Sequence, residues 1–348
     1  MTVYIICPEL SGRGGIETVL NIVIKDLVSK NISVVLYIPS VPQYTEWLTK
    51  LKLMPIHIIF GKKHNHVFTL IKMFISANKD SRFLIASTSR ISVLGLLIRK
   101  LFGKKWLLYH WLHFSLNMNN NYTYLNKCDG ILAISSAITQ QLKSFGINSE
   151  KIHLIYNPFS NSKDKKIYPE SSDKHFVYVG RLEDKQKNVS ELFQALGILK
   201  NTDLVLDIYG DGKDRLKYKK LCNELEIKNM VKWHGWKDNV WESIQYRPDA
   251  LILPSKFEGF PMILLEAMSR GIPCITSDFL GYKDIIIDNI NGYHYHLGNS
   301  KELAKILKKF NAKKFSNESI LNSINKFNQE KYFERFSKAI QIDLDKWR

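Results

Sequence analysis

Short apolar runs alternate with segments of helical periodicity along the chain, and this alternation is the strongest constraint on the fold. The runs at Val3–Cys7, Ser33–Ile38 and Gly130–Ile134 are apolar on both faces, as strands inside a parallel sheet are. The pattern stops at the polar, proline-containing stretch 157–173 and starts again with Phe176–Val179. The sequence therefore predicts two successive α/β domains joined by a linker.

The predicted elements give the domain boundaries. Further strands are predicted at 83–86, 106–111, 204–209, 231–234, 250–253 and 273–276, with helices at 17–29 and 189–200 and a lysine-rich helical region from Lys301 to Arg348. We place a first domain at 1–160, a linker at 161–173, a second domain at 174–320 and, at 321–348, C-terminal helices that cross back to the first domain. Two doubly wound, Rossmann-like domains of this kind would face each other across a cleft, and such folds bind ligands at the carboxyl ends of their strands.

Composition and charge narrow the class of protein. The longest apolar runs are far shorter than the ~20 residues of a membrane-spanning helix, and the opening residues lack a basic leader, so no secretory signal is expected. The four cysteines, at positions 7, 128, 222 and 274, form no C-x-x-C pair, which favours reduced thiols and a cytoplasmic protein. The net charge is +17, of which +12 falls within residues 1–170. A field of this sign attracts a polyanion, either a nucleic acid or an anionic lipid surface.

A glycine-rich segment, Ser11–Glu17, separates the first predicted strand from the first helix. Glycines there let backbone N–H groups approach an anion at a helix N-terminus. The spacing is not G-x-G-x-x-G and no acidic residue ends the second strand, so a dinucleotide site is not predicted. The alternative is a tight strand-to-helix turn, with Glu17 favourable at the helix start.

Two cations follow the first predicted strand of the second domain. Arg181 stands at the end of that strand, and Lys187 stands just before a predicted helix. A guanidinium fork and an ammonium group in these places suit the binding of a diphosphate. The alternative is that both are solvated cations on a loop.

A pair of glutamates follows the predicted strand at 250–253. Glu258 lies in the loop after the strand, and Glu266 is eight residues further on, inside an apolar helix that begins near Pro261. Carboxylates in these places can accept hydrogen bonds from sugar hydroxyls. Because a buried glutamate without a partner is costly, the alternative is that Glu266 caps or pairs within the fold.

One histidine and several absences complete the set of candidate sites. His113 falls at the end of the predicted strand 106–111, on the cleft side, and the alternative is a packed, hydrogen-bonded histidine. No His, Cys, Asp and Glu cluster has metal-ligand spacing, and the only D-x-D motif, Asp343-Leu-Asp345, is expected on a solvated helix face. No Gly-x-Ser-x-Gly elbow and no phosphate-binding P-loop occurs. We therefore predict no metal and no resident cofactor.

Six motifs, in this order, resemble those of the retaining glycosyltransferases of family 4, which have the GT-B fold. They are Gly14-Gly15, Asn157-Pro158, Gly180-Arg181-Leu182, Tyr209-Gly-Asp-Gly212, His234-Gly-Trp236 and the Glu258…Glu266 pair. The glutamate pair is that family's E-x7-E motif, and together the motifs extend over essentially the whole chain. Within the family, segments 14–19, 113–116 and 258–262 are most similar to bacterial lipopolysaccharide core galactosyltransferases.

The resemblance implies which residues bind the donor and which are catalytic. Arg181 and Lys187 would hold the donor diphosphate, and Glu266 would hold the nucleotide ribose. The remaining donor-binding residues would be Gly15, Asn157, Gly210, Glu258, Gly259, Phe260 and Met262, of which the backbone of the last three and the Glu258 side chain would hold the sugar. His113 would contact the sugar from the other domain, so the implied catalytic set is His113, Arg181, Lys187 and Glu258. Pro261 stands where some members have glycine and offers no N–H group.

The function implied is transfer of a hexose, galactose or glucose, from a UDP-sugar to a lipopolysaccharide or another cell-surface glycan. The UDP-sugar is then a substrate and no cofactor is needed. Two alternatives stay open: a sugar-nucleotide epimerase of the same fold, and a basic nucleic-acid-binding protein, although no nucleic-acid module is found in the sequence.

The expected partners are a nucleotide sugar, a glycan or glycolipid acceptor and, peripherally, the anionic inner face of the cell membrane, without nucleic acid. Segments 64–79 and 90–105 are apolar, and the second carries Arg90, Arg99, Lys100, Lys104 and Lys105. Helices with an apolar face flanked by cations can lie in an anionic interface. The alternative is that both apolar faces pack on the sheet.

Overall fold

The computed structural model describes residues 1–61, 65–86, 88–116, 120, 122–159, 174–200 and 202–342. The predicted linker at 161–173 and the Asp343-Leu-Asp345 motif lie outside the described residues. The chain forms two compact units: unit 1 comprises residues 1–158 and 329–348, and unit 2 comprises residues 159–328. Each unit is built on its own parallel sheet, and the prediction of two doubly wound α/β domains is confirmed.

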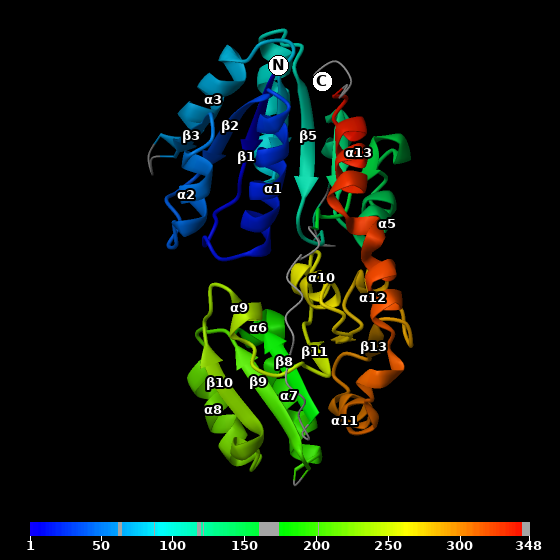
Figure 1. Cartoon of the computed structure of the whole chain (residues 1–348). Helices are drawn as coiled ribbons and strands as arrows, with labels where there is room; N and C mark the ends of the chain where they lie inside the picture. The colour runs from blue at the N-terminus through cyan, green and yellow to red at the C-terminus, as the bar shows by residue number, and fades with distance from the viewer. Residues whose placement is uncertain are drawn as a thin grey trace. The chain divides into compact units, whose positions relative to one another are not determined.

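In the described part of unit 1, seven parallel strands follow the order β3-β2-β1-β4-β5-β6-β7 (Figure 1). The strands are β1 (Thr2–Ile6), β2 (Ser33–Ile38), β3 (Ile56–Phe60), β4 (Arg82–Ile85), β5 (Leu107–Leu112), β6 (Gly130–Ala133) and β7 (Ile152–Leu154). The α-helices are α1 (Gly15–Ser29), α2 (Glu46–Lys52), α3 (His66–Ser76), α4 (Ser89–Leu101), α5 (Ser136–Ser144) and α13 (Gln329–Ala339), with 3-10 turns η1 (Thr123–Lys127) and η2 (Ser149–Lys151). The strand order reverses beside β1, the point at which doubly wound folds bind ligands.

An aromatic cluster fixes α3 to the sheet of unit 1. The Phe74 ring lies 4.7 Å from Phe83 and 5.5 Å from Trp106, measured between ring centres. The Trp106 indole N–H donates to the Phe74 carbonyl oxygen over 3.0 Å, so the polar edge of this buried ring is satisfied. Trp106 was predicted to begin a strand, but β5 begins at Leu107.

The last described segment of the chain packs on unit 1. The Phe336 ring of α13 lies 6.0 Å from the Trp111 ring of β5. Arg82 of β4 donates from Nε to the Ile340 carbonyl oxygen over 3.1 Å. Packing therefore holds α13 on unit 1, and a charge-assisted hydrogen bond holds the residue that follows the helix.

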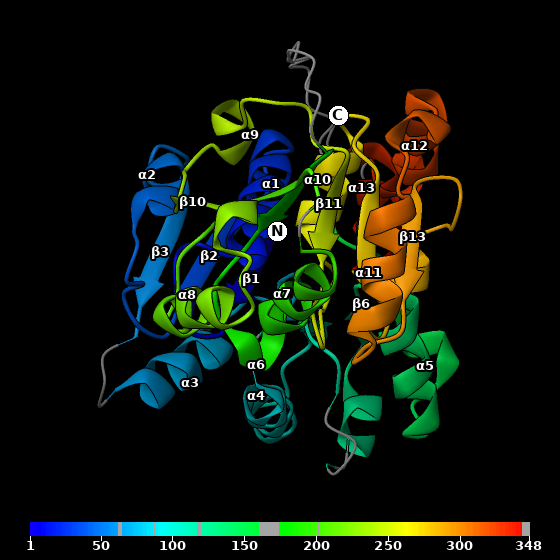
Figure 2. The same cartoon turned by 90° about the horizontal axis from the view of Figure 1, so that it is seen from below.

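In the described part of unit 2, six parallel strands follow the order β10-β9-β8-β11-β12-β13. The strands are β8 (Lys174–Val179), β9 (Leu204–Tyr209), β10 (Val231–Gly235), β11 (Ala250–Leu253), β12 (Cys274–Ser277) and β13 (Gly292–Tyr295). The α-helices are α6 (Asp184–Lys187), α7 (Val189–Ile198), α8 (Arg215–Glu224), α9 (Val240–Ser243), α10 (Met262–Met268), α11 (Ser300–Lys309) and α12 (Asn317–Ile324), and the 3-10 turns are η3 (Lys228–Met230), η4 (Tyr282–Asp284), η5 (Ala312–Lys314) and η6 (Asn325–Phe327). Helix α7 lies between α8 and α11 (Figure 2).

Three strands that the sequence did not predict, β3, β7 and β13, all lie at sheet edges. None is continuously buried, whereas β6, β11 and β12 are buried at every residue. An edge strand has only one neighbouring strand, so its residues need not be apolar on both faces. The search for runs that are apolar on both faces therefore found the inner strands and missed three of the four edge strands in the described residues, while the fourth, β10, was predicted at 231–234.

The lysine-rich region from Lys301 was predicted as helical to Arg348, and this is wrong in detail. The described part consists of α11, α12 and α13 with 3-10 turns between them. Helix α11 stops at Phe310, whose extended backbone places its ring 5.5 Å from Phe315 and 5.7 Å from Phe176. Aromatic packing ends the helix, and the sequence carries no glycine or proline there to signal it. No helix among the described residues is both long and apolar enough to cross a membrane.

Candidate functional site

Two loops of unit 2, at the carboxyl ends of β8 and β9, lie in direct contact. The Gly180 N–H donates to the Tyr209 carbonyl oxygen over 3.0 Å, and the Leu182 N–H donates to the Asp211 carbonyl oxygen over 2.9 Å. At Gly210, φ is +154° and an added Cβ would lie 1.9 Å from the Gly180 carbonyl oxygen. Only glycine fits here, because a side chain would push the two loops apart. Gly210 therefore shapes the loop that carries Arg181.

Arg181 extends from this loop with 53% of its side chain exposed. Its Nη2 donates to Gln186 Oε1 over 2.9 Å, and its Nη1 lies 3.7 Å from Glu183 Oε2. An ion pair this exposed and this long contributes little to stability. The guanidinium is thus oriented by neighbours and accessible to an anion.

Lys187 and Glu258 form a buried pair at the end of the same sheet. The Lys187 Nζ donates to Glu258 Oε1 over 2.6 Å, with only 14% and 8% of the two side chains exposed. The Ser255 hydroxyl donates to the same Oε1 over 2.6 Å, and Ser255 is fully buried. Lys187 ends α6, and Ser255 and Glu258 follow β11, so the fold joins two loops that lie 71 residues apart.

Glu266 lies on α10, and its carboxylate is held from α9. The Trp241 indole N–H donates to Glu266 Oε2 over 2.9 Å. The alternative that Glu266 pairs within the fold therefore holds for one of its two carboxylate oxygens. Arg270 Nη1 donates to the backbone oxygen of Glu266 over 2.9 Å, which ties down the end of the helix.

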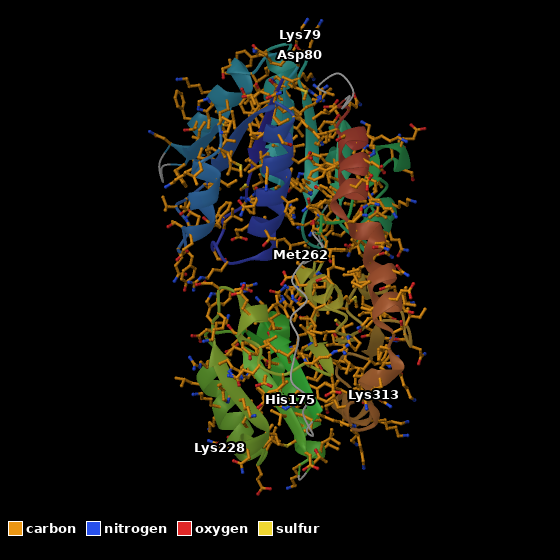
Figure 3. All side chains as sticks on the ribbon, viewed as in Figure 1. Lys79, Asp80, His175, Lys228, Met262 and Lys313 are labelled. Atoms are coloured by element: carbon orange, nitrogen blue, oxygen red, sulfur yellow. The ribbon has the colours of Figure 1, made fainter. Side chains whose placement is uncertain are left out.

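The segment between the two glutamates turns from the loop into α10. Pro261 stands at the N-cap of α10, and Met262 is its first residue (Figure 3). The Phe260 side chain packs on Phe327, with 5.1 Å between the ring centres. Within the described residues, no acceptor is found for the N–H groups of Gly259 and Met262. These two groups remain able to donate to a ligand.

The glycine-rich loop of unit 1 folds around one carboxylate. The Gly12 N–H donates to Glu17 Oε1 over 2.7 Å, and Glu17 is buried. An added Cβ on Gly14 would lie 2.7 Å from Glu17 Oε2, and Gly15 begins α1. Glu17 therefore holds the loop that leads to Gly15, which agrees with the tight-turn interpretation for that glutamate.

His113 and Asn157 are buried in unit 1 with unsatisfied polar atoms. His113 follows β5 with its ring centre 4.6 Å from that of Trp111, and neither ring nitrogen has a partner among the described residues. Burial, together with the nearby His110, lowers the pKa of His113 to about 3, so the ring is neutral at pH 7. Asn157 Oδ1 also has no partner among the described residues. Buried polar groups of this kind need a partner, which an ordered water or a bound ligand can supply.

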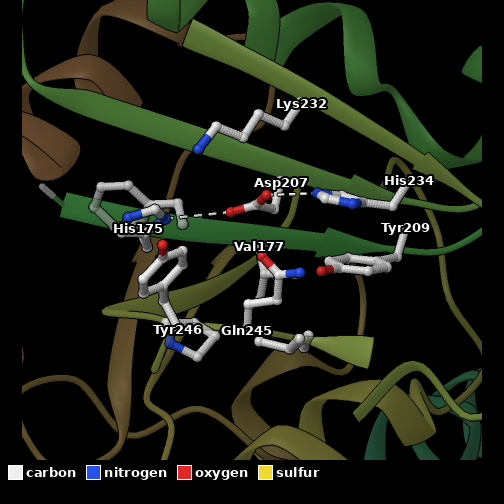
Figure 4. A pocket seen from close by; sticks show the side chains of 11 residues that line it. His175, Val177, Asp207, Tyr209, Lys232, His234, Gln245 and Tyr246 are labelled. Atoms are coloured by element: carbon white, nitrogen blue, oxygen red, sulfur yellow. Dashed lines mark hydrogen bonds and ion pairs between the residues drawn. The ribbon is translucent and has the colours of Figure 1, made fainter. Parts of the chain in front are cut away.

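His234, the first residue of the His-Gly-Trp motif, lines a small cavity of about 30 Å³ on the sheet of unit 2 (Figure 4). His234 Nε2 lies 2.6 Å from Asp207 Oδ1, and His175 Nδ1 lies 3.3 Å from Asp207 Oδ2. The His234 ring is stacked on Tyr209 with 4.4 Å between the centres. A cavity of this size holds about two water molecules. It is too small for a nucleotide sugar, and His234 supports the strand ends instead.

The structure thus gathers the predicted residues of each unit and adds others. Unit 2 holds Arg181, Lys187, Gly210 and the segment Glu258 to Glu266, while unit 1 holds Gly15, His113 and Asn157. Sequence analysis missed Ser255, Trp241 and Gln186, which are the hydrogen-bonding partners of the predicted side chains. No group of three or more His, Cys, Asp or Glu side chains in the described part of the chain could hold a metal ion.

Comparison with known proteins gives two family matches that together cover nearly all of the chain. The family Glycosyltransferase Family 4 matches residues 13–162, and the family Glycosyl transferases group 1 matches residues 160–327. The chain is 33% identical to the lipopolysaccharide 1,6-galactosyltransferase of Escherichia coli K12 over 355 residues, which is 98% of each chain. It is also 33% identical to the enzyme of that name from Salmonella typhimurium LT2, over 99% of this chain and 100% of the relative.

Solved structures agree. The lipopolysaccharide outer core galactosyltransferase WaaB, solved in its apo form, superimposes with a TM-score of 0.82 at 32% identity, over 98% of this chain and 99% of that one. HepE of Anabaena in complex with UDP-glucose superimposes with a TM-score of 0.76 at 17% identity, over 98% of this chain and 99% of that one. The second likeness bears on the fold alone.

Proposed function

The chain belongs to the family 4 glycosyltransferases of the GT-B fold, and we propose that it transfers a hexose from a UDP-sugar to a lipopolysaccharide acceptor with retention of the anomeric configuration. Galactose is the first candidate, because the relatives that match the whole chain are named galactosyltransferases. Glucose and other cell-surface glycans are the alternatives that the sequence left open.

The observation that carries this proposal is the buried Lys187–Glu258 pair beside the accessible guanidinium of Arg181. Arg181 and Lys187 are two cations in the segment between β8 and α7. A diphosphate placed there would accept hydrogen bonds from both cations. Glu258 Oε1 already accepts two hydrogen bonds, while its Oε2 has no partner among the described residues and is directed to a sugar hydroxyl in the proposal.

The proposed reaction breaks the bond between the anomeric carbon and the phosphate oxygen and forms a bond from that carbon to the acceptor oxygen. Negative charge grows on the departing diphosphate, and the cations Arg181 and Lys187 stabilise it. The acceptor hydroxyl proton passes to an oxygen of the leaving phosphate on the same face of the sugar. No second carboxylate near the anomeric carbon is required, unlike in the retaining glycosidases.

The experiment that tests the proposal is incubation of the protein with radiolabelled UDP-galactose or UDP-glucose, with and without a truncated lipopolysaccharide acceptor. Label in the glycan only when acceptor is present supports transfer, and the anomeric coupling constant of the product reports retention. Acceptor-free conversion of one UDP-hexose to the other would support the epimerase instead. No binding of any nucleotide sugar would leave the basic nucleic-acid-binding alternative.

A lipid-anchored acceptor requires an enzyme that reaches the membrane, and we propose that unit 1 binds the cytoplasmic face peripherally. The α3–α4 surface consists of the exposed apolar side chains of these two packed helices and the turn after α4, namely Val67, Phe68, Val93, Leu97, Leu101 and Phe102. Phe68 is 68% exposed and Leu101 is 69% exposed, whereas Leu70, Phe74 and Ile98 pack inward. The apolar residues of α3 and α4 are therefore divided between the core and an exposed surface. Exposed apolar clusters of this kind mark interaction sites.

The cations beside the α3–α4 surface are not equivalent. Arg90, Lys100 and Lys105 are exposed and Lys104 is half-buried. Arg99 is instead bound to the Asp129 carboxylate and donates to the Lys127 carbonyl oxygen over 3.0 Å. Arg99 is thus part of the fold and is removed from the predicted membrane contact.

Co-sedimentation with phosphatidylglycerol vesicles tests this surface. Changing Lys100, Lys104 and Lys105 together to Gln should weaken binding, since each nearby cation adds about 1 kcal/mol of attraction, and salt should weaken the binding of the parent protein. The matched control changes the exposed Lys219, Lys220 and Lys228 of unit 2 to Gln. Equal binding by all three proteins, or no binding at low salt, would contradict the proposal.

A further inference from the structure

We propose that Trp241 is a positioning residue that orients Glu266 toward the ribose hydroxyls of the donor nucleotide. Trp241 belongs to α9, in the connection after β10, and is 6% exposed. Its indole N–H donates to Glu266 Oε2 over 2.9 Å. The inference rests on the proposed function and on the role of binding the ribose, which the family resemblance implies for Glu266.

Trp241 is itself held in place by Arg270. The guanidinium carbon of Arg270 lies 4.7 Å from the centre of the Trp241 ring, within the range of a cation–π contact. The same guanidinium donates to the Glu266 backbone oxygen over 2.9 Å and to Ser269 Oγ over 3.3 Å. One arginine therefore fixes both the backbone that carries Glu266 and the ring that holds its carboxylate.

This arrangement assigns different tasks to the two oxygens of Glu266. Oε2 accepts the indole N–H, and Oε1 has no partner among the described residues. A carboxylate offers about four acceptor positions, so a vicinal diol can still bind. Because the carboxylate is oriented before the ligand arrives, less side-chain freedom is lost when the two hydroxyls bind.

A purely structural role for Trp241 makes a different prediction. If the indole only filled space between α9 and α10, its removal would weaken every nucleotide by the same factor. If it orients Glu266, the loss must depend on the ribose hydroxyls, because those are the groups that the carboxylate would contact. The two roles are separated by changing the protein and the ligand together.

The experiment is titration calorimetry of the parent protein and the Trp241→Phe variant with UDP, 2′-deoxy-UDP and 2′,3′-dideoxy-UDP. Phe keeps an aromatic ring beneath Arg270 and removes the N–H donor. We expect Trp241→Phe to bind UDP about tenfold more weakly, the usual effect of one hydrogen bond to a charged group. With 2′,3′-dideoxy-UDP the two proteins should agree within about twofold. The matched control is Trp233→Phe in β10, whose ring packs on Phe193 at 5.9 Å and which should leave all three affinities unchanged.

Each outcome decides the proposal. Equal losses for all three nucleotides, or unchanged UDP binding in Trp241→Phe, would overturn the positioning role. If the parent protein binds UDP and 2′,3′-dideoxy-UDP equally, the ribose role of Glu266 fails first and Trp241 has nothing to position. If Trp241→Phe does not fold, Arg270→Leu replaces it, because removal of the clamp should produce a smaller loss with the same dependence on the hydroxyls.

Discussion

Removal of the Ser255 hydroxyl is expected to impair transfer without disturbing the fold. Ser255 is fully buried and donates to Glu258 Oε1 over 2.6 Å, the length of a charge-assisted bond. The other donor to that oxygen is Lys187, which the proposed reaction also directs to the diphosphate. In the Ser255→Ala variant, Glu258 Oε1 keeps Lys187 as its donor but loses the Ser255 hydroxyl, so the carboxylate that presents Oε2 to the sugar is held less firmly.

A hydrogen bond to a charged group contributes about 1.5–3 kcal/mol, and each 1.4 kcal/mol is a tenfold change. We therefore expect kcat/KM for the UDP-sugar to fall by about 10- to 100-fold in Ser255→Ala, with the affinity for UDP nearly unchanged, because UDP lacks the sugar that Glu258 holds. Ser255→Thr, which keeps the hydroxyl, should recover most of the loss.

The matched control is Thr276→Val in β12, which removes a buried hydroxyl bond to the Leu253 carbonyl oxygen and does not contact Glu258. Steady-state kinetics at fixed acceptor concentration compares the three variants with the parent protein. If Ser255→Ala and Thr276→Val have the same kcat/KM, the role of the Ser255–Glu258 hydrogen bond is refuted.

Three further outcomes are expected. Gly210→Ala should lower the free energy of unfolding by about 3 kcal/mol, because its Cβ would lie 1.9 Å from a carbonyl oxygen. Gly146→Ala is the control, because Gly146 has φ +74° but open space around it, and the change should cost only about 1 kcal/mol. Urea unfolding measures both values. Burial lowers the pKa of His113 to about 3 from 6.5, so its contribution to stability is present above pH ~6.5 and is lost as the pH falls toward 3. His113→Phe should therefore reduce the pH dependence of the free energy of unfolding in this range by up to about 1.4 kcal/mol per pH unit. An unchanged slope between pH 6 and 4 would contradict this. Transfer should persist in excess EDTA, because Arg181 and Lys187 supply the positive charge, and activity lost on chelation and restored by Mn²⁺ or Mg²⁺ would show otherwise.

The inner strands could be predicted from the sequence because burial on both faces leaves a continuous apolar run. Ser33–Ile38, Leu204–Tyr209 and Ala250–Leu253 were predicted with the bounds that the structure has. The edge strand Ile56–Phe60 could not be found in this way, because it packs against one neighbour only and is partly exposed along its length. Because this edge strand is only partly buried, its sequence does not show the continuous apolar run by which the inner strands were predicted.

The candidate site divides along a similar line. Arg181, Lys187 and Glu258 were identified because they are charged residues in the segments between predicted strands and helices, and because they match motifs of the family that the sequence resembles. Their hydrogen-bonding partners were not, because Ser255 is an ordinary small residue and Trp241 lies 25 positions from the glutamate that it holds. Such contacts exist only after the sheet has brought distant loops together. Arg99 is a similar case, because its sequence position indicates a surface cation and only the structure shows that it binds the Asp129 carboxylate.

The proposed transfer from a UDP-sugar, with Arg181 bound to the donor diphosphate, is tested by the effect of Arg181→Ala on transfer of galactose from UDP-galactose to a truncated lipopolysaccharide. Arg181 is 53% exposed and belongs to no core, so the variant should fold and melt like the parent protein. The loss of one charge-assisted contact to the departing diphosphate should cost about 2–4 kcal/mol, by analogy with the loss of an oxyanion donor. We expect acceptor-dependent transfer by the parent protein and a fall of about 30- to 1,000-fold in kcat/KM in the variant. Near-parental kinetics in a well-folded Arg181→Ala protein would contradict it.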